Sequence, residues 1–440
     1  MKSKVINKTM KVFCTIILMS MVACTKDGEK STEGGSAIKE GDVTTLTMAW
    51  WGNQVRNERT QQALNKYTEM DESVKIEGQF YQWGDYWSKL ATLAAGNSMP
   101  DIIQMDFSYI NQYVESDVLL DLTPYIENES VDFTNINETY QIMAQVGSGN
   151  YGLCNGVNAP CMLYNKTLTD EYGIEVKDYM TIDEFTAIAK EMKEKSGYSV
   201  NLYHESGQYM DSWSRGVDIN IKDKKLGGQS AELYVPYFEI LEKGIKEGWQ
   251  MSYDLPSGSL EQDPLVYGTT PETSAWISLS NSNQLVALQE AAPEGVEIGI
   301  TTIPTQDAKK SNYLKPSQFF SISANTEHPD KSVSVLNYLI NSTEANEILL
   351  AERGIPINSE VGKEISPLLS EKTQDTVSFI NDVIIPRCSP IGSPDPNGKS
   401  EVNRELKTAK EMIIYGDGTP EEAAEYYFTK ANEIFTSKNQ

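Results

Sequence analysis

Three short apolar runs decide the fold: L-T-M-A-W at 46–50, V-K-I-E at 74–77 and D-I-I-Q-M at 101–105. The first and third have the length and apolar character of short buried strands. The second alternates apolar and polar residues, as a half-buried strand does. Pro100 stands directly before the third run and ends whatever helix precedes it.

Helical periodicity fills the two gaps between these runs. Apolar residues recur three and four positions apart in both gaps, with charged and polar residues between them. Asp85 follows a glycine and is a typical N-cap for the second helix. The order strand, helix, strand, helix, strand favours right-handed crossovers and a parallel sheet, so the fold class is α/β. The apolar positions are Ala63, Leu64, Tyr67 and Met70 in the first helix and Tyr86, Leu90, Leu93 and Ala94 in the second.

Length and composition exclude several classes of protein. The 440 residues fit two or three folded units, and 63 acidic against 37 basic side chains give a formal net charge of −26. Such a charge disfavours binding to nucleic acid or to an anionic lipid surface. Two histidines and five cysteines leave little material for a histidine-rich metal site or a disulfide framework. We therefore expect no metal and no cofactor.

The N-terminus has the pattern of a secretory signal. Residues 1–23 contain four lysines and no acidic residue, and an apolar run of 12–23 is too short to span a bilayer. The segment M-V-A-C at 21–24 resembles a bacterial lipobox, which implies a lipid anchor on Cys24. Residues 24–43 would then be a flexible, polar tether. The alternative is an ordinary signal peptide with a chance cysteine.

Cys154 and Cys161 leave two possibilities open. They are close enough in sequence to form a small loop disulfide outside the cytoplasm. Buried free thiols are the favoured alternative, because the cysteines show no paired pattern.

Seven further stretches, spread in order over nearly the whole chain beyond residue 43, resemble one family. Behind the lipobox they resemble the extracytoplasmic solute-binding proteins of ABC carbohydrate importers (family 1), the group that includes maltose-binding protein. The stretches are W-W-G-N at 50–53, W-G-D-Y-W-S-K-L at 83–90, M-P-D-I-I-Q-M-D at 99–106, L-L-D-L-T-P-Y at 119–125, L-Y-N-K at 163–166, I-P-T at 303–305 and R-G-I-P-I-N at 353–358.

This resemblance implies a two-lobed periplasmic-binding-protein fold, with parallel-rich sheets flanked by helices and a hinge of three chain crossings. Sugar would bind in the cleft between the lobes. Independently, ligands in open α/β sheets bind beyond the carboxyl ends of the strands, which points to the loops after Trp50, Phe80 and Met105. Aligned residue by residue, the crossings fall near 154–158, 274–282 and 318–324, the first lobe comprises 44–155 and 282–318, and the second comprises 158–275 and 324–440.

Aromatic residues are the first candidates for ligand contact, because a sugar ring has an apolar face of C–H groups that packs on an aromatic ring. Adjacent strand residues face opposite ways, so only one of Trp50 and Trp51 is expected to reach the cleft, and we favour Trp51. Core packing remains an equal alternative for Trp87. The tryptophan candidates are Trp51, Trp83, Trp87, Trp213 as the opposing plate in a loop of the second lobe, and Trp276 at the second crossing.

Planar polar side chains are the second candidates, because the hydroxyl groups around a sugar ring need fixed hydrogen-bond partners. Asp106 ends a buried strand, where its carboxylate would accept from two hydroxyls, and it is also placed to cap the following helix. Asn53, Gln82 and Asn281 supply amides near the same loops.

These observations predict a receptor rather than an enzyme. The chain would be held on the outer face of the cell membrane only by its N-terminal lipid, and would deliver a mono- or oligosaccharide to ABC permease subunits by lobe closure. It is expected to act as a monomer. The alternatives are a secreted lipoprotein that cleaves glycans, such as a glycoside hydrolase or lyase, and the same fold binding a non-sugar solute.

Overall fold

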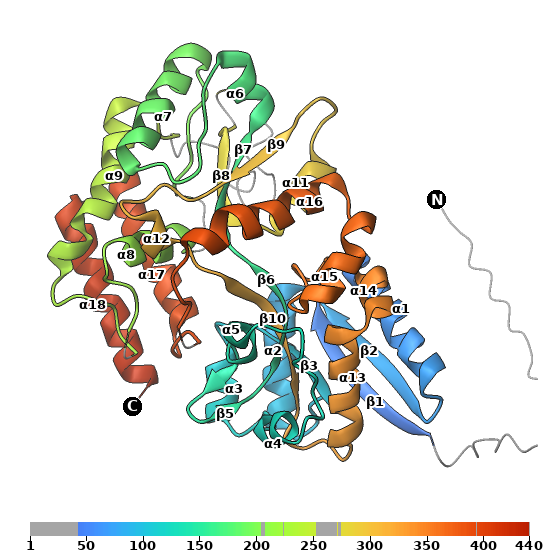
Figure 1. The fold of residues 1–440 in the computed structure, drawn as a ribbon. Coiled ribbons are helices and arrows are strands. Elements are labelled where there is room, and N and C mark those ends of the chain that lie inside the picture. Colours follow the sequence, from blue (N-terminus) through green and yellow to red (C-terminus); the bar gives the residue numbers. More distant parts are fainter. Residues whose placement is uncertain are drawn as a thin grey trace, which may run out of the picture.

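The computed structural model describes residues 43–203, 207–222, 224–251, 271, 274–392 and 394–439. The expected signal peptide, Cys24 and all of the tether except residue 43 lie outside the described residues. The described chain forms two lobes, each built on its own β-sheet and covered by helices (Figure 1).

A five-stranded mixed sheet forms the first lobe. Its strands, with the helices that connect the first three, are β1 (Thr44–Trp51), α1 (Gln54–Met70), β2 (Val74–Tyr81), α2 (Trp83–Ala95), β3 (Ile102–Met105), β6 (Leu153–Asn158) and β10 (Lys315–Ile322). They pair in the order β2-β1-β3-β10-β6, with β1 parallel to both β2 and β3. β10 runs antiparallel to β3 and β6. The predicted order of strand, helix, strand, helix and strand is confirmed.

A three-stranded sheet forms the second lobe. Its strands are β7 (Pro160–Asn165), β8 (Ile277–Asn281) and β9 (Ile298–Thr301), in the order β8-β7-β9. β7 is antiparallel to both neighbours. The expectation of parallel-rich sheets therefore does not extend to this lobe. β7 takes its neighbours from much later segments that run back alongside it, instead of continuing through βαβ crossovers.

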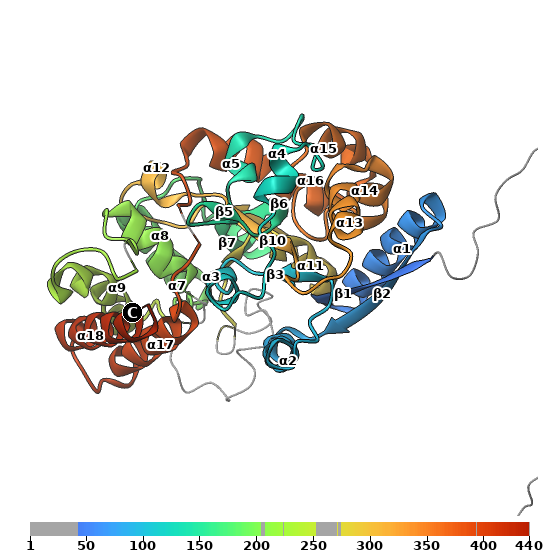
Figure 2. The same cartoon turned by 90° about the horizontal axis from the view of Figure 1, so that it is seen from below.

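Helices cover both sheets. In the first lobe α13 (Pro329–Asn341) and α14 (Thr343–Leu349) pack against α1. In the second lobe α17 (Lys399–Tyr415) and α18 (Pro420–Lys438) lie side by side next to α9 (Val235–Glu247), at the opposite end of the molecule from β1 and β2 (Figure 2). The other elements are α3 (Ile110–Glu115), α4 (Thr123–Glu127), α5 (Glu138–Gln141), β4 (Gln145–Val146), β5 (Gly149–Asn150), α6 (Lys166–Tyr172), α7 (Ile182–Ser196), α8 (Gln208–Gly216), η1 (Ala231–Tyr234), α11 (Gln284–Ala291), α12 (Ala308–Ser311), α15 (Ser359–Ile365), η3 (Ser366–Leu368), α16 (Glu371–Ser378), η4 (Phe379–Ile384) and η5 (Ile385–Arg387).

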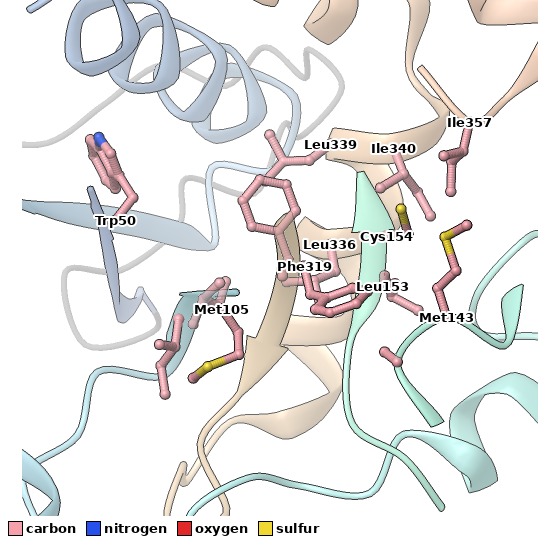
Figure 3. Close-up of a cluster of buried hydrophobic side chains, with 14 of the residues drawn as sticks. Trp50, Met105, Met143, Leu153, Cys154, Phe319, Leu336, Leu339, Ile340 and Ile357 are labelled. Atoms are coloured by element: carbon pink, nitrogen blue, oxygen red, sulfur yellow. The ribbon is translucent and has the colours of Figure 1, made fainter. Parts of the chain in front are cut away.

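Each lobe has a buried apolar core. In the first, Phe319 of β10 and Leu336 of α13 lie together between sheet and helix (Figure 3). Trp50 is fully buried there, and its indole Nε1 donates to Asn57 Oδ1 at 2.9 Å. Large aromatic side chains fill the second core, among them Trp249 and Phe238. The first cluster also includes Leu163 of β7 and Ile298 of β9, so it continues onto one face of the second-lobe sheet.

The cysteines of the described chain are free thiols, which decides between the two possibilities for Cys154 and Cys161. Both are buried, and the thiol of Cys154 donates to the carbonyl oxygen of Gly156 at 3.2 Å. Cys388 is partly exposed.

The chain crosses between the sheets at other places than the sequence predicts. The first crossing, at Ala159 between β6 and β7, lies just beyond the expected 154–158. No crossing occurs within 274–282, because β8 pairs with β7 and the chain goes on to β9 in the same sheet. The chain reaches the first sheet again only at β10, before the expected 318–324.

The lobe assignments change accordingly. β9 lies in the range 282–318 assigned to the first lobe, yet it pairs with β7 of the second. Conversely, α13 and α14 lie in the range 324–440 assigned to the second lobe, yet they pack on α1, β6 and β10 of the first. The chain returns to the second lobe between α14 and α16, where Lys372 of α16 donates to the carbonyl oxygen of Ile298 at 3.3 Å. A short amphipathic segment does not reveal which of two sheets it will join, because both bury the same kind of side chain.

Candidate ligand-binding cleft

A cleft of about 1500 Å³ lies between the two lobes. First-lobe residues that follow β1, β2 and β3 line one side of it. Residues of α8, the 391–396 segment and the start of α17 line the other side. The floor consists of strand ends at the junction of the two sheets, including Asn158, Asn281 and Lys315.

Trp51 and Trp83 form an aromatic wall on the first-lobe side. Trp51 ends β1 and is 8% exposed, whereas its neighbour Trp50 turns into the core, as strand alternation requires. Trp83 begins α2 and is 45% exposed, with its ring edge-on to Trp51 at a centroid distance of 5.0 Å. Because α2 begins at Trp83, Asp85 lies in its first turn and is not its N-cap. Both rings line the cleft, as the sequence predicts.

The four predicted polar residues also line the cleft. Asn53 caps α1, and its Oδ1 accepts from the backbone N–H of Arg56 at 2.9 Å. Asp106 follows β3, and its Oδ1 accepts from the backbone N–H of Ser108 at 2.9 Å. In Asn53 and Asp106, Oδ1 accepts the local backbone hydrogen bond, and both residues line the cleft. The other two are Gln82, which precedes α2, and Asn281, the last residue of β8.

Three predicted tryptophans do not line the cleft. Trp87 is half-buried and stacks on Tyr109, with the ring centroids 3.8 Å apart and the planes 8° from parallel. Trp213 is 1% exposed, since the segment expected to be a loop is helix α8, which turns this side chain against Tyr237 in the second core. Trp276 is fully buried, because the expected crossing there is absent. The opposing plate predicted at Trp213 is therefore wrong.

The second-lobe wall is polar and charged instead. Lys399 at the start of α17 forms an ion pair with Asp211 of α8, with Nζ and Oδ1 2.6 Å apart. The guanidinium of Arg215 lies over the ring of Tyr313, 4.1 Å from its centroid, and donates to the carbonyl oxygen of Ile391 at 2.6 Å. The sequence pattern does not predict these residues. No local signal joins them, because Lys399 and Asp211 are 188 positions apart.

Asp395 lies beside this ion pair on the same wall. Burial raises the pKa of its carboxyl group, and the positive charge of Lys399 opposes that rise. Burial acts to lower the pKa of Lys399, but the carboxylates of Asp211 and Asp395 raise it overall. Lys399 therefore stays protonated in its ion pair with Asp211.

The two lobes touch at one edge of the cleft, in a rim contact made by Ser108, Asn111 and Glu115 of the first lobe with Lys224 and the 394–397 segment of the second. The side-chain amide of Asn111 donates to the carbonyl oxygens of Pro394 and Asp395, at 3.1 and 2.7 Å. Glu115 accepts from Asn397 and pairs with Lys224 at 3.3 Å. The lobes are thus bonded at this edge while the cavity between them stays open.

Other kinds of site are not evident in the part of the chain that the structure describes. No group of three or more His, Cys, Asp or Glu side chains there is placed to hold a metal ion. None of the helices in that part combines the length and apolar character needed to cross a membrane.

A family model of bacterial extracellular solute-binding proteins matches residues 62–376, well over half of the chain. The chain belongs to this family. Membership implies a location outside the cytoplasm, and the recognition made from the seven short stretches is confirmed. The family and the relatives below are named as binding proteins, not as enzymes.

Curated relatives of this solute-binding protein are distant in sequence. A carbohydrate ABC transporter substrate-binding protein of Streptococcus pneumoniae is 23% identical over 367 residues, covering 78% of this chain and 71% of the relative. The arabinooligosaccharide-binding protein of Bacillus subtilis is 24% identical over 187 residues, 42% of each chain. This chain thus matches less than half the length of the Bacillus protein.

A solved structure shares the fold over nearly its whole length. The extracellular solute-binding protein family 1 structure from Alicyclobacillus acidocaldarius is 25% identical, with a TM-score of 0.69. The match covers 89% of this chain and 98% of that one. The predicted two-lobed α/β architecture is confirmed.

Proposed function

We propose that this solute-binding protein is a lipid-anchored receptor that captures a mono- or oligosaccharide between its lobes and delivers it to an ABC importer. The observation that carries the proposal is the cleft of about 1500 Å³ with tryptophans on one wall and polar and charged groups on the other. A cavity of this size exceeds the usual range for one drug-sized ligand, which favours an oligosaccharide.

The two walls match the two surfaces of a sugar ring. The exposed ring of Trp83 and the adjoining Trp51 offer apolar surface to the C–H face of a sugar. The carboxylate of Asp106 accepts hydrogen bonds from hydroxyl groups, and the amides of Gln82 and Asn53 both donate and accept. A ligand that contacts both lobes favours the closed arrangement, which the permease would recognise.

The names of the relatives support a carbohydrate as the ligand. One is named as an arabinooligosaccharide-binding protein and another as a carbohydrate ABC transporter substrate-binding protein. We extend that chemistry to this chain because the cleft presents aromatic and hydroxyl-binding groups together. The particular sugar is left to experiment.

The experiment is a thermal-shift screen of residues 43–440 against a panel of neutral and acidic oligosaccharides, followed by calorimetry on each hit. A ligand that binds only the folded state raises the melting temperature, and the rise grows with the logarithm of the ligand concentration above its Kd. We expect at least one glycan to do so and to be recovered intact after prolonged incubation. No shift with any glycan, or the appearance of cleavage products, would overturn the proposal.

Membrane attachment through Cys24 is a separate part of the proposal and rests on the M-V-A-C pattern at 21–24. Two acyl chains on the cysteine give stable anchoring, whereas a single chain gives reversible binding. In cells expressing the full chain, we expect Cys24→Ser to move the protein from the membrane fraction to the medium or the soluble extract. Retention of the variant in the membrane fraction would disprove the anchor.

A further inference from the structure

We infer that Asn158 and Asn281 form a hydrogen-bonding subsite at the floor of the cleft, which holds two neighbouring hydroxyl groups of one sugar ring. This inference rests on the proposed function and adds to it the group that is recognised and the residues that recognise it.

The strand pairing brings these two side chains together. Asn158 ends β6, Ala159 is the only residue between the sheets, and Pro160 begins β7. Pro160 is the register partner of Asn281 on β8. Ser282, the residue after Asn281, also bonds to Ala159. Its backbone N–H donates to the carbonyl oxygen of Ala159 at 2.9 Å, and its hydroxyl oxygen accepts from the backbone N–H of Ala159 at 3.2 Å. The two asparagines therefore stand on either side of one fixed point in the hinge.

Both side chains lack the hydrogen bonds that a buried amide normally makes. Asn158 is 6% exposed, and the Oδ1 atoms of Asn158 and Asn281 are buried with no partner among the described residues. A buried polar atom without a partner destabilises the folded protein, so such atoms are rare unless something else supplies the bond. Both residues line the cleft, so a ligand at its floor can supply that partner once each amide turns its shielded Oδ1 toward the cavity.

A structural asparagine in the first lobe shows the contrast. Asn150 is as deeply buried, but its Nδ2 donates to the carbonyl oxygen of Gln141 at 2.8 Å and its Oδ1 accepts from the backbone N–H of Gly152 at 3.2 Å. Asn150 holds its loop together by these bonds. Asn158 and Asn281 make no comparable bonds, so their amide groups are not needed to hold the fold.

The chemistry of two unpartnered amides selects a hydroxyl pair. Each amide offers a donor and an acceptor, and each sugar hydroxyl also both donates and accepts. A carboxylate could bond the amide nitrogens but has no proton to give to Oδ1, and an apolar group would satisfy neither atom. Lys315, the register partner of Asn158 on β10, adds an ammonium donor for a third ligand oxygen.

The position of the subsite also couples ligand binding to lobe closure, because its residues come from both lobes. Asn158 and Lys315 belong to the first-lobe sheet, and Asn281 belongs to the second-lobe sheet. A sugar ring held by all three contacts both lobes at the hinge, where a small change in angle moves the distant edges of the lobes most.

The test uses Asn158→Leu and Asn281→Leu in the 43–440 protein, with a glycan from the screen as ligand. Leucine removes the polar atoms and keeps the number and branching of the side-chain heavy atoms, with bulkier methyl groups in their place. We expect each variant to bind the glycan at least tenfold more weakly by calorimetry, with an unliganded melting temperature equal to or above that of wild type. The matched control Asn150→Leu should do the reverse, lowering the melting temperature while the folded protein binds normally. Alanine at each position repeats the measurement if a leucine variant does not fold.

Monodeoxy analogues of the glycan identify the group that is bound. Loss of the critical hydroxyl should weaken binding at least tenfold in wild type and less than twofold in the asparagine variants. If wild type binds a glycan but both variants bind it equally well, the subsite is disproved and the proposed function stands. A fall in melting temperature as large as that of the Asn150 variant would also disprove it, by making the amides structural. If wild type binds no glycan, both proposals fail.

Discussion

The side-chain amide of Asn111 on α3 donates to the carbonyl oxygen of Asp395, across the edge of the cleft, at 2.7 Å. The two residues are 284 positions apart and belong to different lobes, so this bond joins the lobes directly across the cleft edge. The same amide bonds to the carbonyl oxygen of Pro394, and Glu115 adds an ion pair one turn later. The lobes are therefore bonded directly to each other, apart from the hinge.

Asn111→Ala is expected to shift the unliganded protein toward an open arrangement. A hydrogen bond of this kind contributes about 1 kcal/mol, which corresponds to about a fivefold change in the ratio of closed to open molecules. The radius of gyration from small-angle X-ray scattering should increase, and ligand affinity should fall by a similar factor. Asn65→Ala, on the exposed side of α1, is the control. An unchanged radius and affinity would show that the rim contact does not hold the lobes.

Trp83→Ala should weaken sugar binding by about 1–2 kcal/mol, because the variant loses an aromatic surface that stacks on the ligand. Trp83 is 45% exposed, so its removal should change the melting temperature little. Trp213→Phe is the matched control: that side chain is buried in the second core, and its substitution should lower stability and leave affinity unchanged. Calorimetry measures the sugar affinity of both variants. Wild-type affinity in Trp83→Ala would show that Trp83 does not contact the ligand.

Asp106→Asn is expected to weaken binding by about 1–2 kcal/mol while the fold is kept. Asparagine retains the Oδ1 that accepts from the N–H of Ser108, so the turn after β3 survives. The negative charge that strengthens hydrogen bonds from sugar hydroxyls is lost. Titration calorimetry of Asp106→Asn and Asp106→Ala separates the two roles. Equal affinity in wild type and Asp106→Asn would show that the charge takes no part in binding.

Trp276→Ala should destabilise the second lobe by about 3–5 kcal/mol, the cost of removing a fully buried large side chain. Urea unfolding followed by circular dichroism measures the change. The sequence predicts Trp276 at the ligand, whereas the side chain is buried in the core. A variant that unfolds like wild type but binds sugar weakly would restore the ligand role.

Native Cys154 should resist thiol reagents at pH 8, whereas the partly exposed Cys388 should react first. Burial raises the pKa of Cys154 from 9.0 to about 12. This group's contribution to stability is therefore fully present below about pH 9 and is lost as the pH rises toward 12, since the unfolded chain releases the proton first. The rate at which a thiol reagent modifies the 43–440 protein, compared with the rate for Cys388→Ser, shows which cysteine reacts first. Rapid modification of Cys154 at pH 8 in folded protein would contradict the burial.

The first βαβαβ unit could be predicted because its signals are local. The runs at 46–50, 74–77 and 101–105 and the helical periodicity between them are each complete within a few turns of chain. The first wall of the cleft follows from the same segment, since Trp51, Trp83 and Asp106 stand where strands end. Strand alternation requires that Trp50 and Trp51 face opposite sides of the sheet, but it does not say which of them faces the core. The structure shows that Trp50 does.

Other predictions failed where partners are distant in sequence. Trp213 and Trp276 have the residue type of a sugar-binding plate, but their burial depends on α9, α18 and the second sheet, which lie elsewhere in the chain. The ion pair of Lys399 with Asp211 and the bond of Asn111 to Asp395 leave no trace in the local pattern.

By itself, the sequence determined the α/β class, the family and the side chains at the ends of the first three strands, because hydrophobic periodicity and short motifs act over neighbouring residues. Only the tertiary structure decided which segments belong to which lobe, which tryptophans reach the cleft and which groups form its second wall. Those features depend on contacts between residues more than a hundred positions apart, such as β7 with β8. Many segments could satisfy such a contact equally well in isolation, and only packing of the whole chain selects one.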